Sequence, residues 1–284
     1  MLFRFPQGSR RVVSSPSATH RRVCARLCAA GFLCVMACPL RAVPQQESEA
    51  RYRRLAQHLV EQRLAGGEEK ESVQEEAFLL LDEIVLRALN AAARPNTADI
   101  ESRLAVLAGP QPAVGENFRL APLGTDGADG PFALVVNLGL GGPSAVRLYA
   151  RPDSIGARAA GRFQRSARID RFVHPDFFDE TLELVPAAGA PGLFVTVSGR
   201  TDDLATGMFT AWQFDGTRLR KVWASDMLQQ SRYEPAPKGI LLNYCAQADE
   251  ARPRVCVKMV RERYEWDGAA WRRAEQKDLP VPTK

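Results

Sequence analysis

Beyond residue 110, the apolar residues of this chain occur in short runs that Gly, Pro or Asp interrupt. Short runs with turn residues between them are typical of β-strands. Because no segment of helical length separates most of them, neighbouring strands are expected to pair antiparallel, as hairpins. Two other segments, 155–161 and 225–233, are compatible with a turn of helix. The predicted strands cover residues 132–136, 146–149, 182–185, 193–197, 208–214, 218–224, 239–246, 255–265 and 270–274.

One hairpin sequence occurs twice. Residues 212–221 and 264–273 share the form aromatic–x–aromatic–Asp–Gly–x–x–apolar–basic–basic. Each copy follows another predicted strand, at 193–198 and 240–246, so the repeating unit is a three-stranded meander. A third, degenerate copy begins at Phe132.

The Asp-Gly pair in each copy predicts a tight turn. Both residues of this pair tolerate the positive φ angles that the two central positions of a type I′ turn require. A two-residue turn at the Asp-Gly pair places Trp212 opposite Leu219 in the first hairpin. In the second hairpin it places Tyr264 opposite Trp271, so each hairpin buries one aromatic face.

These patterns predict an α+β protein in which a helical region at 43–110 precedes an antiparallel β-meander domain at 111–284. A twisted sheet or sandwich-like arrangement is the first expectation for the β domain. A propeller-like arrangement is the second, because four blades need about sixteen strands and the sequence indicates clearly fewer.

The helical region carries apolar residues at steps of three and four. In the first predicted helix they include Tyr52 and Leu59, and Gly66 ends that helix. Pro95 stops the second helix, and Asn96 or Thr97 caps the start of a third. These helices must pack on each other, on the β domain or on a partner.

The first 42 residues read as an export signal. They contain seven arginines, no Asp or Glu, and an uncharged apolar run at 27–40. A membrane-spanning helix needs about 20 apolar residues, so the run is too short for one. Cleavage is expected after Ala37 or Ala42. The residues ending at Cys38 resemble a bacterial lipobox, so a lipid on Cys38 is a second alternative and an uncleaved anchor a third.

Removing the leader changes the charge of the chain. Without the seven leader arginines, the 38 basic residues fall to 31 against 33 acidic ones, a net charge of −2. The high pI of the full chain therefore does not indicate a nucleic-acid partner. The mature chain is expected to have no transmembrane span and to be periplasmic or secreted, unless a lipid anchors it through Cys38.

Only two cysteines follow the leader, Cys245 and Cys256. An even number of cysteines in an exported protein favours a disulfide, and two buried free thiols are the alternative. If the two cysteines lie opposite each other in a hairpin, Tyr244 lies opposite Val257.

Few residues indicate chemistry. His174 lies near Asp176 and Asp179 in an aromatic, acidic segment, where it would make an acid/base dyad or a weak metal site. Asp202 and Asp203 would bind calcium or a sugar, but the repeated acidic residues of a calcium loop are missing. With no nucleophile motif, no catalytic residues, metal or cofactor are predicted.

The sequence therefore favours an exported cell-envelope protein that binds or scaffolds another envelope protein or a glycan. The alternative is a glycosidase-like envelope hydrolase that uses two of the acidic residues at 176, 179, 202 and 203. That alternative requires two of these carboxylates to lie roughly 5–10 Å apart in one cleft.

Overall fold

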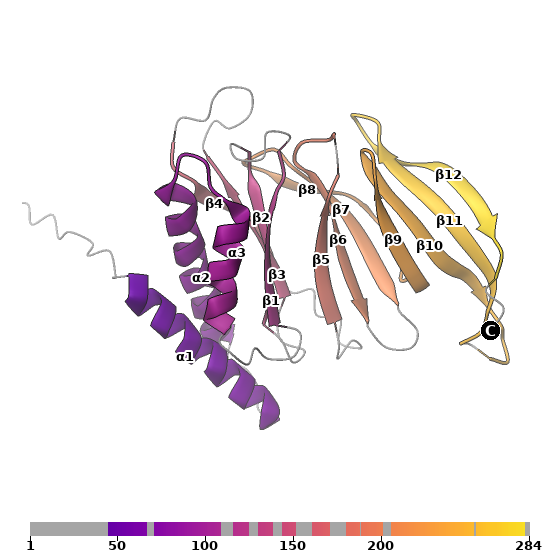
Figure 1. Cartoon of the computed structure of the whole chain (residues 1–284). Coiled ribbons are helices and arrows are strands. Elements are labelled where there is room, and N and C mark those ends of the chain that lie inside the picture. Colours follow the sequence, from indigo (N-terminus) through magenta and orange to yellow (C-terminus); the bar gives the residue numbers. More distant parts are fainter. Residues whose placement is uncertain are drawn as a thin grey trace, which may run out of the picture. The chain divides into compact units, whose positions relative to one another are not determined.

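The structure is a computed structural model in which three helices precede twelve strands in the part of the chain that is described (Figure 1). The described residues are 45–66, 71–108, 116–124, 130–138, 144–151, 161–170, 180–187, 189–200, 206–252 and 254–281. The helices are α1 (Gln45–Leu64), α2 (Glu71–Ala91) and α3 (Thr97–Ala108).

The helix ends follow local rules. Gly66 has a φ of 67° just beyond α1, in the left-handed region that glycine adopts without strain. At the start of α3, the Asn96 side-chain oxygen accepts a hydrogen bond from the Ala98 N–H at 3.0 Å. Asn96 is thus the N-cap of α3, as one of the two sequence alternatives predicted.

The strands form three four-stranded antiparallel sheets, each a meander in chain order. Sheet 1 contains β1 (Glu116–Pro122), β2 (Phe132–Leu138), β3 (Ser144–Ala150) and β4 (Gln164–Asp170). Sheet 2 contains β5 (Glu180–Pro186), β6 (Leu193–Arg200), β7 (Gly207–Phe214) and β8 (Leu219–Ala224). Sheet 3 contains β9 (Gln229–Ala236), β10 (Gly239–Ala248), β11 (Cys256–Trp266) and β12 (Trp271–Leu279). The predicted α+β meander class is confirmed, and the domain boundary at residue 110 stays a prediction.

Three of the twelve strands were not predicted: β1, β4 and β9. The helical interpretation of residues 225–233 is wrong, because β9 begins at Gln229. All three lie at the edge of a sheet, where a strand needs fewer apolar residues and its sequence therefore shows no apolar run. The helical turn considered at 155–161 falls almost wholly outside the described residues.

Sheet 1 is buried on both faces because successive side chains of a strand point to opposite sides. Leu134 packs into one core with Leu81 of α2. Its neighbour Val135 packs into a second core with Phe194 of sheet 2. Every residue of β2 and β3 is accordingly buried.

Sheet 2 is covered in the same way. Phe194 faces sheet 1, whereas Val195 lies in a third core with Ile240 and Leu242 of sheet 3. The helices and the three sheets therefore pack as successive layers, with a separate apolar core at each junction.

Sheet 3 has a polar outer face that ends this series of layers. On that face Arg261 donates to the Asn243 side chain at 2.8 Å, and Arg263 forms ion pairs with Glu265 and Glu275 at 2.8 and 3.3 Å. Charged residues on a sheet face or edge disfavour further sheet packing.

A buried polar network joins α2 to sheet 1. Asp82 accepts hydrogen bonds from the Tyr149 hydroxyl at 2.8 Å and from Arg165 at 2.7 Å, and the fully buried Arg147 lies 3.7 Å away. The Arg147 guanidinium also stacks over the Phe78 ring, 4.6 Å from its centroid. Burial raises the pKa of Tyr149 well above its usual value, and the Asp82 carboxylate raises it further. The network fixes how α2 sits on β3 and β4.

The repeated Asp-Gly hairpins join β7 to β8 and β11 to β12, but their turns differ from the prediction. Phe214 pairs with Leu219, and Trp266 pairs with Trp271. Each loop therefore contains four residues, and the predicted two-residue turn with its aromatic pairings is wrong. Trp212 lies opposite Lys221 rather than Leu219.

The reason lies in the aspartate side chains. The Asp215 carboxylate accepts the N–H groups of Thr217 and Arg218 at 2.9 and 2.6 Å. Asp267 accepts those of Ala269 and Ala270, both at 2.8 Å. This side-chain capping stabilises a longer loop, and only the glycine that follows each aspartate takes a positive φ.

Two other turns contain a residue with a positive φ whose carbonyl group is hydrogen-bonded to one of these hairpins. Gly192 has a φ of 72° and its carbonyl accepts the Phe214 N–H at 2.8 Å. Lys238 has a φ of 58° and its carbonyl accepts the Trp266 N–H at 2.9 Å. A Cβ on Gly192 would lie 2.0 Å from the Phe214 carbonyl oxygen, so only glycine fits there.

We expect Lys238→Gly to raise the free energy of unfolding by about 1 kcal/mol, because glycine takes the left-handed conformation without strain. Gly192→Ala should lower it by about 2–4 kcal/mol, through the positive φ and the clash together. Gly268→Ala is the control, since its φ is 103° but nothing lies within 4 Å of its added Cβ. Equal losses for the two glycine variants in urea denaturation would contradict this account.

The two loop aspartates predict a pH dependence. Backbone hydrogen bonds, from Arg218 and Thr217 to Asp215 and from Ala270 and Ala269 to Asp267, lower the pKa of both carboxyls. The ordinary pKa of an Asp carboxyl, which applies in the unfolded chain, is about 3.9. When the folded-state pKa is lower, the carboxyl stabilises the fold at pH values above about 3.9, and this stabilisation is lost as the pH falls through the folded-state pKa. The double variant D215N/D267N should therefore be less stable than the native chain at pH 7. Chemical denaturation should show this gap closing toward pH 2, and a gap that is constant with pH would refute the prediction.

Candidate functional site

The polar site that the sequence singled out is not among the described residues. His174, Asp176, Asp179, Asp202 and Asp203 lie outside the described residues. Cys38 also lies outside them. The dyad, the calcium site and the lipid anchor therefore stay predictions.

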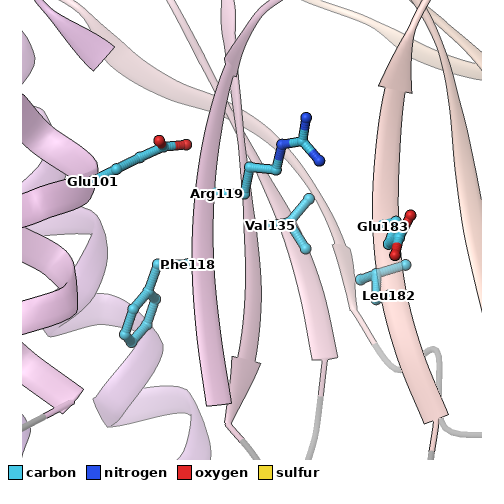
Figure 2. Close-up of a pocket in the computed structure, with 6 residues that line it drawn as sticks. All are labelled: Glu101, Phe118, Arg119, Val135, Leu182 and Glu183. Carbon is cyan, nitrogen blue, oxygen red and sulfur yellow. The ribbon is translucent and has the colours of Figure 1, made fainter. Parts of the chain in front are cut away.

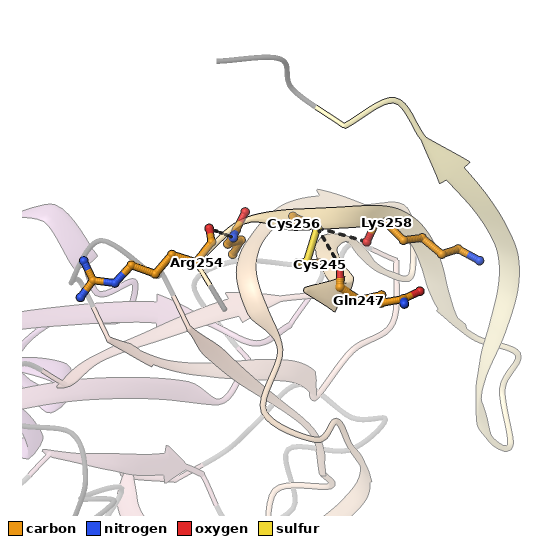
Figure 3. Close-up of a disulfide and its surroundings, with 6 residues drawn as sticks. Cys245, Gln247, Arg254, Cys256 and Lys258 are labelled. Atoms are coloured by element: carbon orange, nitrogen blue, oxygen red, sulfur yellow. Dashed lines mark hydrogen bonds between the residues drawn. A yellow bond between two sulfur atoms is a disulfide. The ribbon is translucent and has the colours of Figure 1, made fainter. Parts of the chain in front are cut away.

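The predicted disulfide is present. Cys245 on β10 and Cys256 on β11 are bonded, with a Cα–Cα distance of 5.7 Å, and both side chains are buried (Figure 3). The predicted register is wrong, because Cys245 pairs with Met259 and Cys256 with Ala248. The two cysteines are not cross-strand partners, and the register shifts twice at this end of the ladder, between Cys245 and Gln247 and between Gln247 and Ala248.

A pocket of about 360 Å³ lies at the open edge of β1 (Figure 2). Its walls come from a helix and from the first strands of two sheets, with one residue from β2. The lining residues are Glu101 of α3, Phe118 and Arg119 of β1, Val135 of β2, and Leu182 and Glu183 of β5.

Glu101 partly closes the β1 edge. Its carboxylate accepts the Leu120 N–H at 2.6 Å, as the carbonyl of a neighbouring strand would. Pro122 lies two residues further along the same edge and has no N–H to offer. The strand is thereby protected from pairing along its C-terminal half, and the pocket lies beside the remaining part.

Arg119 is the cation of the pocket. Its side chain is exposed and extends from β1 into the space between β1 and β5 (Figure 2). In the part of the chain that the structure describes, its guanidinium makes no hydrogen bond or ion pair. The planar N–H fork of arginine matches carboxylate and phosphate groups.

Glu183 faces the pocket from the edge strand of sheet 2, and the Tyr233 hydroxyl of β9 donates a hydrogen bond to it. Burial raises the pKa of Tyr233, the Glu183 hydrogen bond raises it further, and the charge of Arg119 lowers it. The edge strands β1, β5 and β9 thus bring Arg119, Glu183 and Tyr233 close together.

The ionisable groups that line the pocket are one arginine and two carboxylates, and the six lining residues include no Ser, Thr, Cys, Lys or His. Among the described residues, no three or more His, Cys, Asp or Glu side chains are grouped so that they could hold a metal ion. The arrangement fits a ligand that accepts hydrogen bonds from Arg119 and donates them to Glu183.

Sequence reasoning missed all of the lining residues. Glu101, Arg119 and Glu183 are far apart in the sequence and form no motif. The available signal was weak: a single arginine in an otherwise apolar segment before the predicted sheet.

None of the described helices combines the length and the apolar character that a bilayer crossing requires. The chain matches no protein-family model, no curated protein and no solved structure.

The disulfide provides a direct test. Reduction should add two hydrogen atoms to the intact mass, and C245S/C256S should lower the free energy of unfolding by about 2–3 kcal/mol, because the bond closes a short loop. The native chain with reduced thiols is the control, since it should lose a similar amount. A mass that reduction leaves unchanged would show that the bond does not form.

Proposed function

We propose that this chain is an exported cell-envelope protein that acts as a non-catalytic binding or scaffolding module. The observation that carries the proposal is the pocket in which Arg119 of sheet 1 and Glu183 of sheet 2 meet beside Glu101 of α3. Charged groups drawn from separate layers of a well-packed body are suited to hold a ligand in a fixed orientation.

The leader and the disulfide support the proposed location. A basic, acid-free leader with a short apolar run is typical of export, and disulfides persist in oxidising compartments. We place the protein in the periplasm or outside the cell, with a lipid on Cys38 as the alternative mode of retention. Its partner is another envelope protein or a glycan.

We further interpret the three sheets as propeller-like units rather than the two halves of a sandwich. Each is a single meander of four strands, which is the composition of a propeller blade. The meeting of the edge strands β1, β5 and β9 near Arg119 supports this interpretation, since blades also converge through their first strands.

The full chain, tagged at its C-terminus and expressed in a Gram-negative bacterium, tests the proposal. It should fractionate with the envelope and begin at Cys38 or Val43. Capture from envelope extract should be lost in Arg119→Gln and kept in Arg232→Gln, an exposed arginine on the outer face of sheet 3.

Two results would count against this function. One is a cytosolic protein that keeps Met1, or capture that does not depend on Arg119. The other is release of reducing sugar ends from envelope glycans by the purified protein, which would indicate the hydrolase instead.

A further inference from the structure

The Arg119 pocket has a charge pattern that selects among anions. Glu101 and Glu183 line the same pocket as Arg119, so its three charged groups together carry a net charge of −1. Each carboxylate is already engaged, Glu101 with the Leu120 N–H and Glu183 with the Tyr233 hydroxyl. Each carboxylate can still accept further hydrogen bonds, whereas the guanidinium has no hydrogen bond or ion pair within the described part of the chain and is the group best placed to bind an anion.

This pattern disfavours multiply charged ligands. A phosphate, a sulfate or an anionic glycan would bring several negative charges next to two carboxylates, and like charges at short range repel. A single carboxylate fits better, because it pairs with both N–H groups of the guanidinium fork at the lowest charge. Neutral sugars would leave the fork without an ionic partner.

The exposed backbone of β1 adds a second recognition element. In an antiparallel ladder, alternate residues direct both N–H and C=O to the same edge. Leu120 directs its N–H to Glu101, so Phe118, two residues earlier, offers its N–H and C=O at the pocket. Because Glu101 and Pro122 close the edge beyond Phe118, an added strand has room to pair only along the first part of β1, at Glu116 and Phe118, and must end or turn away at the pocket. That space suits the end of a chain better than its middle.

The remaining walls are apolar. Val135 and Leu182 line the pocket, whereas the Phe118 ring packs against Tyr52 in the core between the helices and sheet 1. The volume of about 360 Å³ is at the small end of ligand sites. A small apolar side chain next to the carboxylate would be accommodated there.

We propose that this pocket binds the free carboxylate end of an extended peptide with an apolar last residue. The carboxylate pairs with Arg119, and the last peptide unit bonds to the β1 edge at Phe118. Glu183 accepts an N–H from the preceding residue and rejects an acidic one. This inference rests on the proposed binding function and names the ligand class.

Calorimetric titration of the purified protein with acetyl-Ala-Ala-Leu tests the proposal, with the C-terminal amide of the same peptide as the paired probe. Amidation should weaken binding about tenfold or more, because it removes the charge-assisted bonds. Arg119→Gln should have a similar effect, and Arg119→Lys should also weaken binding because it keeps the charge but lacks the fork. Arg232→Gln is the matched control and should bind as the native protein does. Both Arg119 variants replace an exposed side chain, and thermal melts verify that they fold.

Equal binding of the acid and the amide would overturn the proposal, as would binding that Arg119→Gln leaves intact. Saturable binding of a neutral oligosaccharide or of inorganic phosphate, without the peptide acid, would also overturn it. If envelope capture depends on Arg119 but the peptide acid does not bind, the ligand class is wrong and the binding function stands. If capture is also independent of Arg119, both fail.

Discussion

The structure depends on one constraint: the strands β2 and β3 of sheet 1 and β6 of sheet 2 are buried on both faces, so a layer must cover each side of these sheets. Val135 and Leu134 are neighbours in β2 and enter different cores. Burial of apolar surface stabilises by about 25 cal/mol per Å², and here it is available only if layers cover both faces. The helices cover sheet 1 on one side, and sheet 3 covers sheet 2. Sheet 3 needs no further layer on its outer face, because that face carries charged residues such as Arg261 and Arg263.

The candidate site is a consequence of this layering. Sheets that pack face to face leave their edge strands close to one another, and polar residues at these edges need not be buried. Arg119, Glu183 and Tyr233 are such residues, and the Tyr233–Glu183 hydrogen bond joins the edges of sheets 2 and 3. Glu101 serves two purposes, because it satisfies the Leu120 N–H and limits the open length of β1. The same contacts protect the edge and shape the pocket.

Sequence patterns predicted most of the fold where the cause was local. The central strands, the Asn96 N-cap and the disulfide between Cys245 and Cys256 all appear. The sequence-based predictions were wrong where groups outside the local pattern determined the turn, the strand register or the strand itself. The Asp215 carboxylate caps Thr217 and Arg218 and lengthens a loop that the Asp-Gly pair alone suggested would be tight. The β10–β11 ladder keeps one register from Gly239 to Cys245, three residues away from the predicted one, and the two cysteines alone do not specify it. Edge strands such as β9 lack the apolar run that identifies a buried strand.

From the amino-acid sequence alone come the basic leader, the helical start, the β-meander and the cysteine pair, because each depends on residues close together in the chain. Only the tertiary structure determined that the strands form three separate sheets, and that Asp82 of α2 bonds to Tyr149 and Arg165 of sheet 1. It alone brought Glu101, Arg119 and Glu183 to one pocket. The physical reason is that packing of two-sided apolar sheets is a long-range choice, and residues that meet through it carry no mark of their partners in the sequence.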